Sequence, residues 1–337
     1  MTVEPPFGHP ATTLPGKPLD PASDYFDLDV PLDGYRWWYL DVVSDDGRYS
    51  LVIIGFIGSV FSPYYASARR RGPADPYAHC ALNAILYGPG RRKRWAMTER
   101  SASMFNSRAQ GVNIGPSSMY WDNNALVVDI DERCNPLPIA FRGQVRLQPT
   151  LVNPHAFALH SNGQHHWWPV APVATAEVKL QSPDVQFSGS AYLDSNFGNR
   201  PLERDFSDWD WTRSESPVRD GKTPAITYRC NETDGQRTAL SLAIDEHGTQ
   251  RTAQVGAHLK LSSAIRQVAR STLSDAPVRK IKTLEDTPFY VRSLLTTDTA
   301  KLVHESLDRG RFSSRWLQTL LPFRMPRNDS QRCQENQ

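Results

Sequence analysis

The sequence has few cysteines, no excess charge of either sign and no long apolar run. Its four cysteines are far apart in 337 residues and show no CxxC spacing, so we expect reduced thiols and a cytosolic setting. Thirty-eight basic against thirty-six acidic residues leave a net charge of +2, which argues against nucleic-acid binding, because that binding depends on concentrated positive charge. No apolar run approaches the roughly 20 residues of a membrane-spanning helix, and the first residues show no secretory signal pattern. These absences favour a soluble or peripheral protein.

Motifs for metals, nucleophiles and phosphates are also missing. There is no HExxH or paired Cys/His spacing, no GxSxG turn and no glycine-rich phosphate loop. His165 and His166 are adjacent, so on a strand they point to opposite faces and do not easily bind one ion together. We therefore expect no metal, and either cofactor-independent chemistry or no chemistry.

Short segments rich in β-branched and aromatic residues fill the first half of the chain, each bounded by Gly, Asn, Asp or Pro. No segment before Pro154 shows a helical period over three turns, so we expect this half to be all-β. The expected strands are Tyr35–Asp41, Tyr49–Val60, Cys80–Tyr87, Arg94–Glu99, Val112–Ile114, Met119–Trp121, Ala125–Ile130 and Ile139–Leu147. Asp122–Asn124 is a plausible tight turn between two of them.

A second set of short strands begins around His166 and implies a second barrel or sandwich. The one helix expected near the end is Ser313–Leu321, stopped by Pro322. The expected strands are Ala174–Leu180, Val185–Ala191, Asp208–Arg213, Ala225–Cys230, Ala239–Ile244, Val255–Leu261, Val278–Lys282, Phe289–Thr296 and Lys301–Leu307.

The length suits two domains of ordinary size. Residues 1–24 contain six prolines and predict an extended, flexible arm. We expect one β domain over residues 25–172 and another over 173–326, followed by a polar tail at 327–337.

Aromatic and titratable residues concentrate in residues 155–213, which we expect to build the functional site. This stretch holds four of the nine histidines and four of the nine tryptophans. They are His155, His160, His165, His166, Trp167, Trp168, Trp209 and Trp211, and the acids among them are Asp194, Glu203, Asp205, Asp208 and Asp210.

Two pairs in this stretch share a strand face. Tyr192 and Asp194 have the same parity, as do His165 and Trp167. A carboxyl group among aromatic rings in an apolar cavity has its ionised form disfavoured, which raises its pKa and makes it a general acid near neutral pH. Aromatic faces stabilise a developing cation by roughly 2 kcal/mol when desolvated. The structural alternative is that Asp194 only caps a turn with the residues that follow it.

Other charged segments favour structural roles. The run FSDWDW places two acids on one face and two tryptophans on the other, which is typical of a half-buried strand. Arg69–Arg71 and Arg91–Arg94 predict a solvated face. A weak attraction to anionic lipid is the alternative for these basic runs, at about 1 kcal/mol per residue near the surface.

Long motifs resemble those of the carotenoid 1,2-hydratases, also called hydroxyneurosporene synthases, of purple photosynthetic bacteria. In the first half they are YRWWYLDVVSDDG, LVIIGFIGSVFSPYYA, DPYAHCALNAILYG and RWAMTER. They continue with HHWWPVAP, SGSAYLDSNFG, DWDW, VHESLDRGRF and LLPFRMP. The motifs span most of the chain in the same order.

The resemblance implies two lipocalin-like domains and a hydro-lyase that adds water across the terminal 1,2 double bond of acyclic carotenoids such as neurosporene and lycopene. No metal or organic cofactor is implied. In the family, an Asp of a Tyr-x-Asp motif is thought to donate the proton, assisted by a His-x-Trp motif. These positions fall on Asp194 with Tyr192 and on His165 with Trp167, while the doubled HHWW leaves His166 with Trp168 as an alternative register.

A substrate that resides in membrane implies a cytoplasmic enzyme associated peripherally with the intracytoplasmic membrane. Two other functions stay open: a non-catalytic lipocalin-like carrier of apolar ligands, and a cofactor-free isomerase or pericyclase on the same scaffold. The preferred carotenoid, hydration at one end or both, and the oligomeric state are not predicted.

Overall fold

The structure is a computed structural model that describes residues 9–10, 12–13, 18–27, 29–90, 92–108, 110–215, 225–244, 250–253, 256–262 and 265–329. Over these residues the chain divides into two units. The first unit comprises β1 (His9–Pro10), β2 (Thr12–Thr13) and residues 155–167 and 202–317. The second comprises the described parts of residues 17–154, 168–201 and 318–337.

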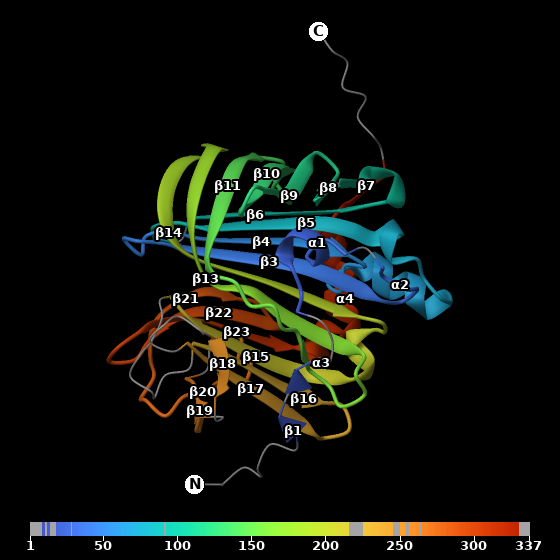
Figure 1. Ribbon diagram of the computed structural model, residues 1–337. Coiled ribbons are helices and arrows are strands. Elements are labelled where there is room, and N and C mark those ends of the chain that lie inside the picture. The colour runs from blue at the N-terminus through green and yellow to red at the C-terminus, as the bar shows by residue number, and fades with distance from the viewer. Residues whose placement is uncertain are drawn as a thin grey trace. The chain divides into compact units, whose positions relative to one another are not determined.

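The second unit is built on one long sheet, coloured blue to yellow-green in Figure 1. The sheet curls on itself (Figure 1). As a result, the side chain of Met119 in β9 lies against Gly55 of β4. Along the sheet the strands are β24 (Arg327–Asn328), β6 (Lys93–Arg100), β5 (Cys80–Tyr87), β4 (Ser50–Ile57), β3 (Tyr35–Ser44), β14 (Asp184–Gly198), β13 (His165–Ser182), β11 (Ala140–Leu151), β10 (Ala125–Arg133), β9 (Ser117–Asp122), β8 (Gly111–Ile114) and β7 (Phe105–Arg108).

The first unit contains a second sheet, drawn largely in orange in Figure 1, which is antiparallel apart from the parallel pairing of β1 with its neighbour. Its order is β1, β17 (Arg237–Ile244), β16 (Ile226–Glu232), β15 (Phe206–Ser214), β23 (Lys301–Asp308), β22 (Tyr290–Thr296) and β21 (Arg279–Asp286), with β18 (Gln250–Ala253) beside β17. The hairpin of β19 (His258–Lys260) and β20 (Ser271–Leu273) is separate, and β12 (Phe157–Ala158) pairs with β2 and with the start of β13.

The all-β prediction is confirmed, and the expected strands coincide closely with observed ones. β3 and β4 form the expected hairpin. β9 ends at Asp122 and β10 begins at Ala125, directly opposite, with Asn123 at φ 53° in the turn. Asn adopts this left-handed conformation more readily than most residues, which is why the sequence identified the turn. Of the expected strand Val255–Leu261, Val255 lies outside the described residues and His258–Lys260 form β19. Parts of the expected arm and residues 330–337 of the expected tail also lie outside the described residues.

Three helical expectations need correction. Residues 63–71, where the sequence shows no helical period, form α2 (Pro63–Arg71), because the Ser62 hydroxyl caps the first turn and Pro63 suits its first position. The C-terminal helix α4 (Arg315–Arg324) includes Pro322 instead of stopping before it. Within residues 1–24, expected to be an extended arm, Pro21–Asp24 form the short helix α1, capped by Asp20.

The remaining helical elements are short. They are α3 (Arg309–Phe312) and the 3-10 turns η1 (Pro76–His79), η2 (Ala102–Met104) and η3 (Leu202–Arg204). Among the described residues no helix is long and apolar enough to cross a membrane.

The division between the units differs from the contiguous boundary expected at residues 172 and 173. β14 pairs with β3 over ten residue pairs, and β13 pairs with β11 over residues 173–182. Residues 168–201 therefore complete the sheet begun by the first half of the chain. The hydrogen-bonding partners of these strands, rather than their place in the sequence, determine the unit to which they belong.

Candidate active site

Tyr192 and Asp194 lie on the same face of β14 and contact each other directly. The Tyr192 hydroxyl donates a hydrogen bond of 2.8 Å to Oδ2 of Asp194. Both side chains are buried, with Tyr192 0% and Asp194 4% exposed. A carboxylate so enclosed is kept from bulk water and has a phenol as a neighbouring donor.

Asp194 stands within a continuous strand. In the ladder with β3 it lies opposite Tyr39, and Tyr192 lies opposite Asp41. The rings of Tyr39 and Tyr192 contact edge to face, with centroids 6.1 Å apart. Because β14 continues to Gly198, the alternative in which Asp194 only caps a turn does not hold.

Tyr25 holds the backbone of Asp194 in place. Its hydroxyl donates to the main-chain carbonyl of Asp194 at 3.3 Å, and its own carbonyl accepts from the indole of Trp38 at 2.6 Å. Burial raises the pKa of Tyr25 well above its ordinary value, and the charge of Asp194 raises it further while that of Arg36 opposes the shift. Tyr25 therefore stays protonated and remains a donor. The sequence did not single it out, since it is far from Asp194 along the chain.

In the first unit, His165 is held by a carboxylate. Its Nε2 lies 2.6 Å from Oδ2 of Asp205, and both side chains are buried. Nearby, Nε2 of His160 lies 3.0 Å from Oε2 of Glu232, and the ring of Phe206 packs 4.8 Å from that of His165. The sequence placed Asp205 among the acids of this stretch but gave no reason to join it to His165.

Trp167 is fully buried between two rings. Its centroid lies 5.9 Å from that of Phe157 and 5.3 Å from that of Tyr228. The alternative residues are placed differently: burial lowers the pKa of His166, and the indole of Trp168 donates to the Asn153 carbonyl at 2.6 Å. The burial and carboxylate contact of His165 favour the His165/Trp167 register.

The structure brings the members of each proposed pair together within one unit. Tyr192 and Asp194 belong to the second unit, and His165 and Trp167 to the first. Across the part of the chain that is described, no group of three or more His, Cys, Asp or Glu side chains is arranged to hold a metal ion.

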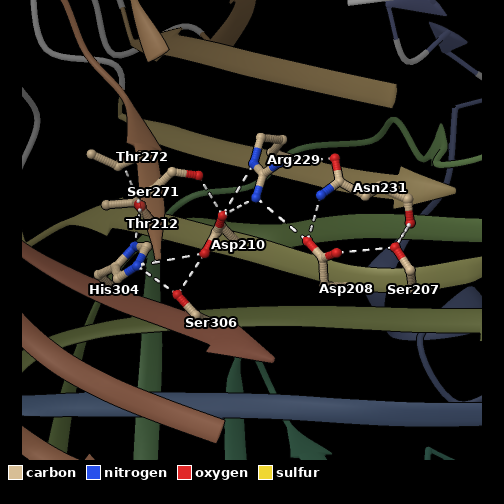
Figure 2. Close-up of polar contacts among 10 residues, drawn as sticks. All are labelled: Ser207, Asp208, Asp210, Thr212, Arg229, Asn231, Ser271, Thr272, His304 and Ser306. Carbon is tan, nitrogen blue, oxygen red and sulfur yellow. Dashed lines mark hydrogen bonds and ion pairs between the residues drawn. The ribbon is translucent and has the colours of Figure 1, made fainter. Parts of the chain in front are cut away.

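The FSDWDW run forms part of β15, and its acids enter a buried polar network in the first unit. Asp210 accepts hydrogen bonds from Ser271 at 2.6 Å and Ser306 at 2.5 Å, and it contacts the guanidinium of Arg229. Figure 2 shows these side chains converging from β15, β16, β20 and β23. Asp208 extends the network through Asn231 at 2.7 Å. The network joins four strands and supports the framework role expected for this run.

His304 completes this network in its neutral form. Burial lowers its pKa to about 4, although the charge of Asp210 opposes the shift. At neutral pH its 3.8 Å approach to Asp210 is therefore not an ion pair. Nδ1 instead pairs with the Thr212 hydroxyl and Nε2 with that of Ser306, both at 2.9 Å.

Comparison with known proteins identifies the family. Residues 53–334 match the model of the carotenoid hydratase CrtC family. The chain is 44% identical over 328 residues to an acyclic carotenoid 1,2-hydratase of Thiocapsa roseopersicina, covering 95% of this chain and 79% of that protein. It is 40% identical to the acyclic carotenoid 1,2-hydratase of Rubrivivax gelatinosus, covering 90% and 75%. The chain belongs to the carotenoid hydratase family. The resemblance seen in its motifs is confirmed.

A solved structure supports the fold assignment. The crystal structure of a putative AttH from Nitrosomonas europaea aligns with a TM-score of 0.56 at 13% identity, covering 88% of this chain and 98% of that chain. At this identity the similarity shows the fold alone. The lipocalin-like architecture implied by the resemblance is confirmed.

Proposed function

We propose that this chain hydrates acyclic carotenoids at the terminal 1,2 double bond, with Asp194 as the proton donor. The buried Tyr192–Asp194 hydrogen bond of 2.8 Å carries the proposal for the donor. Relatives that cover most of this chain at 40–44% identity are named acyclic carotenoid 1,2-hydratases, which supports the reaction. The proposal needs neither a metal nor an organic cofactor.

The chemistry follows from the stability of the cation. Protonation of a trisubstituted terminal alkene at C2 by the Asp194 carboxylic acid places the positive charge on the tertiary carbon C1. Water then forms a bond to C1 through its oxygen and loses one proton, so that one water is added and no proton is consumed. Within the second unit, the aromatic ring of Tyr192 would stabilise the cation. Excluding other water from this step limits side reactions.

In the first unit, the contact of His165 Nε2 with the Asp205 carboxylate supports a role for His165 as a base. The carboxylate also stabilises the imidazolium that forms, as in other His–carboxylate pairs. Before the next turnover the His165 imidazolium gives up one proton and the Asp194 carboxylate takes up one, so that no net proton is consumed. Asp205 is accordingly a positioning residue, since it acts through His165.

An acyclic polyene dissolves in membranes rather than in water, so we also propose a peripheral contact with a membrane surface on the cytoplasmic side. Such a contact would let the enzyme take substrate from the bilayer without spanning it. A carrier, an isomerase or a pericyclase that acts on the same polyene would need the same membrane contact. These alternatives differ from a hydratase only in the product.

Incubation of the purified protein with lycopene, followed by mass spectrometry of the extract, tests the function. Hydration gives 1-hydroxylycopene, which is heavier than lycopene by one water. A carrier returns unchanged lycopene bound stoichiometrically, and an isomerase or pericyclase returns a product of unchanged mass. Either of these two results would refute the proposal.

A further inference from the structure

Helix α4 exposes a stripe of large apolar side chains. Trp316, Leu320 and Phe323 are 56%, 51% and 72% exposed. Their spacing of i, i+4 and i+7 places them on one face of the helix, while Leu317 and Leu321 are buried on another. A helix that has already buried one apolar face and still presents a second one fits a surface that is completed by a partner.

The loop between β10 and β11 exposes further apolar side chains. Leu137 is 67% and Ile139 41% exposed. This loop closes through a hydrogen bond from the Cys134 amide to the Ile139 carbonyl. Burial raises the pKa of the Cys134 thiol, and the charges of Arg94 and Arg324 oppose that rise. The Cys134 thiol also contacts the backbone of Trp95, and Arg324 of α4 stacks over the ring of Trp95, so this loop and the end of α4 meet at Trp95.

A basic residue lies at the end of the stripe. Residues 308–329 contain five arginines and two aspartates. Three of these arginines pair with carboxylates, Arg309 with Glu203, Arg311 with Asp308 and Arg327 with Glu99, so the charge beside the stripe is that of Arg324 at the end of α4. Arg324 directly follows Phe323 and stacks over the ring of Trp95 at 4.8 Å from its centroid. Arg94 and Trp95 are adjacent in β6, so basic residues from two separate parts of the chain, Arg94 and Arg324, lie close to Trp95.

We infer that the α4 stripe (Trp316, Leu320 and Phe323), with the loop of Leu137 and Ile139, docks on an anionic lipid bilayer. Exposed apolar side chains beside arginines match a surface with an apolar interior and a negatively charged boundary, and a Trp is suited to the headgroup level. A short helix that lies in the interface needs no spanning length. These residues would form the membrane contact that the proposed function requires. Only the biological role of the contact depends on the proposed function.

Flotation with vesicles that contain no carotenoid tests the surface apart from catalysis. Vesicles of phosphatidylcholine with a third of phosphatidylglycerol are compared with vesicles of phosphatidylcholine alone. Each comparison is made at low salt and at 0.5 M salt, because added salt screens the attraction between the arginines and the anionic lipid. We expect the wild-type protein to float with the anionic vesicles, and to do so less at high salt. Replacing Trp316, Leu320 and Phe323 together by Ser should lower the partition coefficient at least about a hundredfold, since each large apolar side chain contributes roughly tenfold.

A matched control replaces Leu32, Ile265 and Ile281 by Ser, because these residues are similarly exposed at 59%, 91% and 54%. This variant should float like the wild type. The inference is overturned if the wild type does not float, if the α4 variant floats equally well, or if the control loses as much binding. A wild-type dimer in sedimentation velocity that only the α4 variant dissociates, with no flotation, would assign the stripe to self-association instead.

Two further measurements separate loss of the docking surface from misfolding and from loss of catalysis. If the triple variant loses its near-ultraviolet circular dichroism, the single variant Phe323→Ser decides, with an expected loss of about tenfold. Flotation without turnover of micellar lycopene would refute the proposed function and leave the docking surface standing. Turnover without flotation would do the reverse.

Discussion

Asp194 differs from an ordinary surface aspartate in its contacts. Its carboxylate accepts a hydrogen bond from the Tyr192 hydroxyl, and its main-chain carbonyl accepts one from Tyr25. Its side chain is almost fully buried. Fixing both the carboxyl group and the backbone behind it limits the directions in which the acid can point. A proton donor to a carbon atom needs this restriction, because an alkene offers no lone pair to guide the transfer.

Replacing Asp194 by Asn tests the donor. The amide keeps the size of the carboxyl group and can still accept from Tyr192, but it cannot supply the proton. We expect the rate of lycopene hydration to fall by at least about a hundredfold, the range of general acid catalysis, with little change in melting temperature. Asp184→Asn, at an exposed position of the same strand, is the control and should retain full activity. A near wild-type rate for Asp194→Asn would disprove the assignment.

The two adjacent histidines can be separated in the same assay. His165→Ala should lower the rate by roughly ten- to a hundredfold, because it removes the base that Asp205 orients. His166→Ala should cost little, since His166 is partly exposed and points to the other face of β13. Asp205→Asn should reproduce part of the His165 loss and shift the pH profile of the rate, which a purely structural role would not do. If both histidine variants lost the same small part of the rate, neither histidine would take part in the reaction.

Sequence parity predicted the contact between Tyr192 and Asp194, because neighbours on one strand face depend only on strand formation. It could not predict the contribution of Tyr25 or Asp205. Their partners are 169 and 40 residues away in the chain, and no local spacing links such positions. A contact of this kind depends on which strands pair and in which register, and this is set by packing of the whole unit.

At the scale of elements, β15 shows how one strand can have a polar and an apolar face that are both buried. Alternation in FSDWDW predicted the two faces correctly, with Asp210 and Trp211 pointing apart. It predicted a half-buried strand, whereas both of these residues are almost fully buried. The difference arises because Ser271 of the β19–β20 hairpin packs onto the polar face and donates to Asp210. Helix α2 was missed for a different reason: its capping pair Ser62–Pro63 is a clear signal, but the aromatic and arginine residues that follow lack a helical period.

The buried network of β15 predicts how stability depends on pH. His304 has a folded-state pKa of about 4, below the ordinary value of about 6.5. The unfolded chain therefore binds the proton more readily between these values, and the free energy of unfolding should fall as the pH drops from about 6.5 to about 4. One such proton contributes at most about 1.4 kcal/mol per pH unit.

Urea denaturation across this pH range measures the effect. The His304→Gln variant keeps a donor and an acceptor at this position but does not titrate. Its stability should therefore fall less steeply with acid than that of the wild type, with the difference confined to the window between pH 4 and 6.5. Identical slopes in the two proteins would show that His304 does not contribute.

For the whole molecule, the all-β class could be predicted from the sequence, but the assignment of strands to the two sheets could not. Strand signals recur evenly from Tyr35 to Leu307, so nothing local marks where one sheet ends. In the sheet of the second unit, β14 pairs with β3, which lies about 150 residues earlier in the chain. Gly189 permits this close pairing, since a Cβ atom there would lie 2.0 Å from the Val43 carbonyl oxygen.

This division predicts which fragments of the chain can fold. A fragment of residues 25–172 follows the boundary suggested by the sequence but lacks β14 and most of β13, which stand between β3 and β11 in the sheet. It would expose two unpaired inner strands, so we expect it to aggregate or to melt without a cooperative transition. A fragment of residues 17–201 restores both strands and loses only α4 and β24 at one edge, and we expect it to melt cooperatively in circular dichroism. Cooperative melting of residues 25–172 at the temperature found for residues 17–201 would show that β14 is dispensable to the second unit.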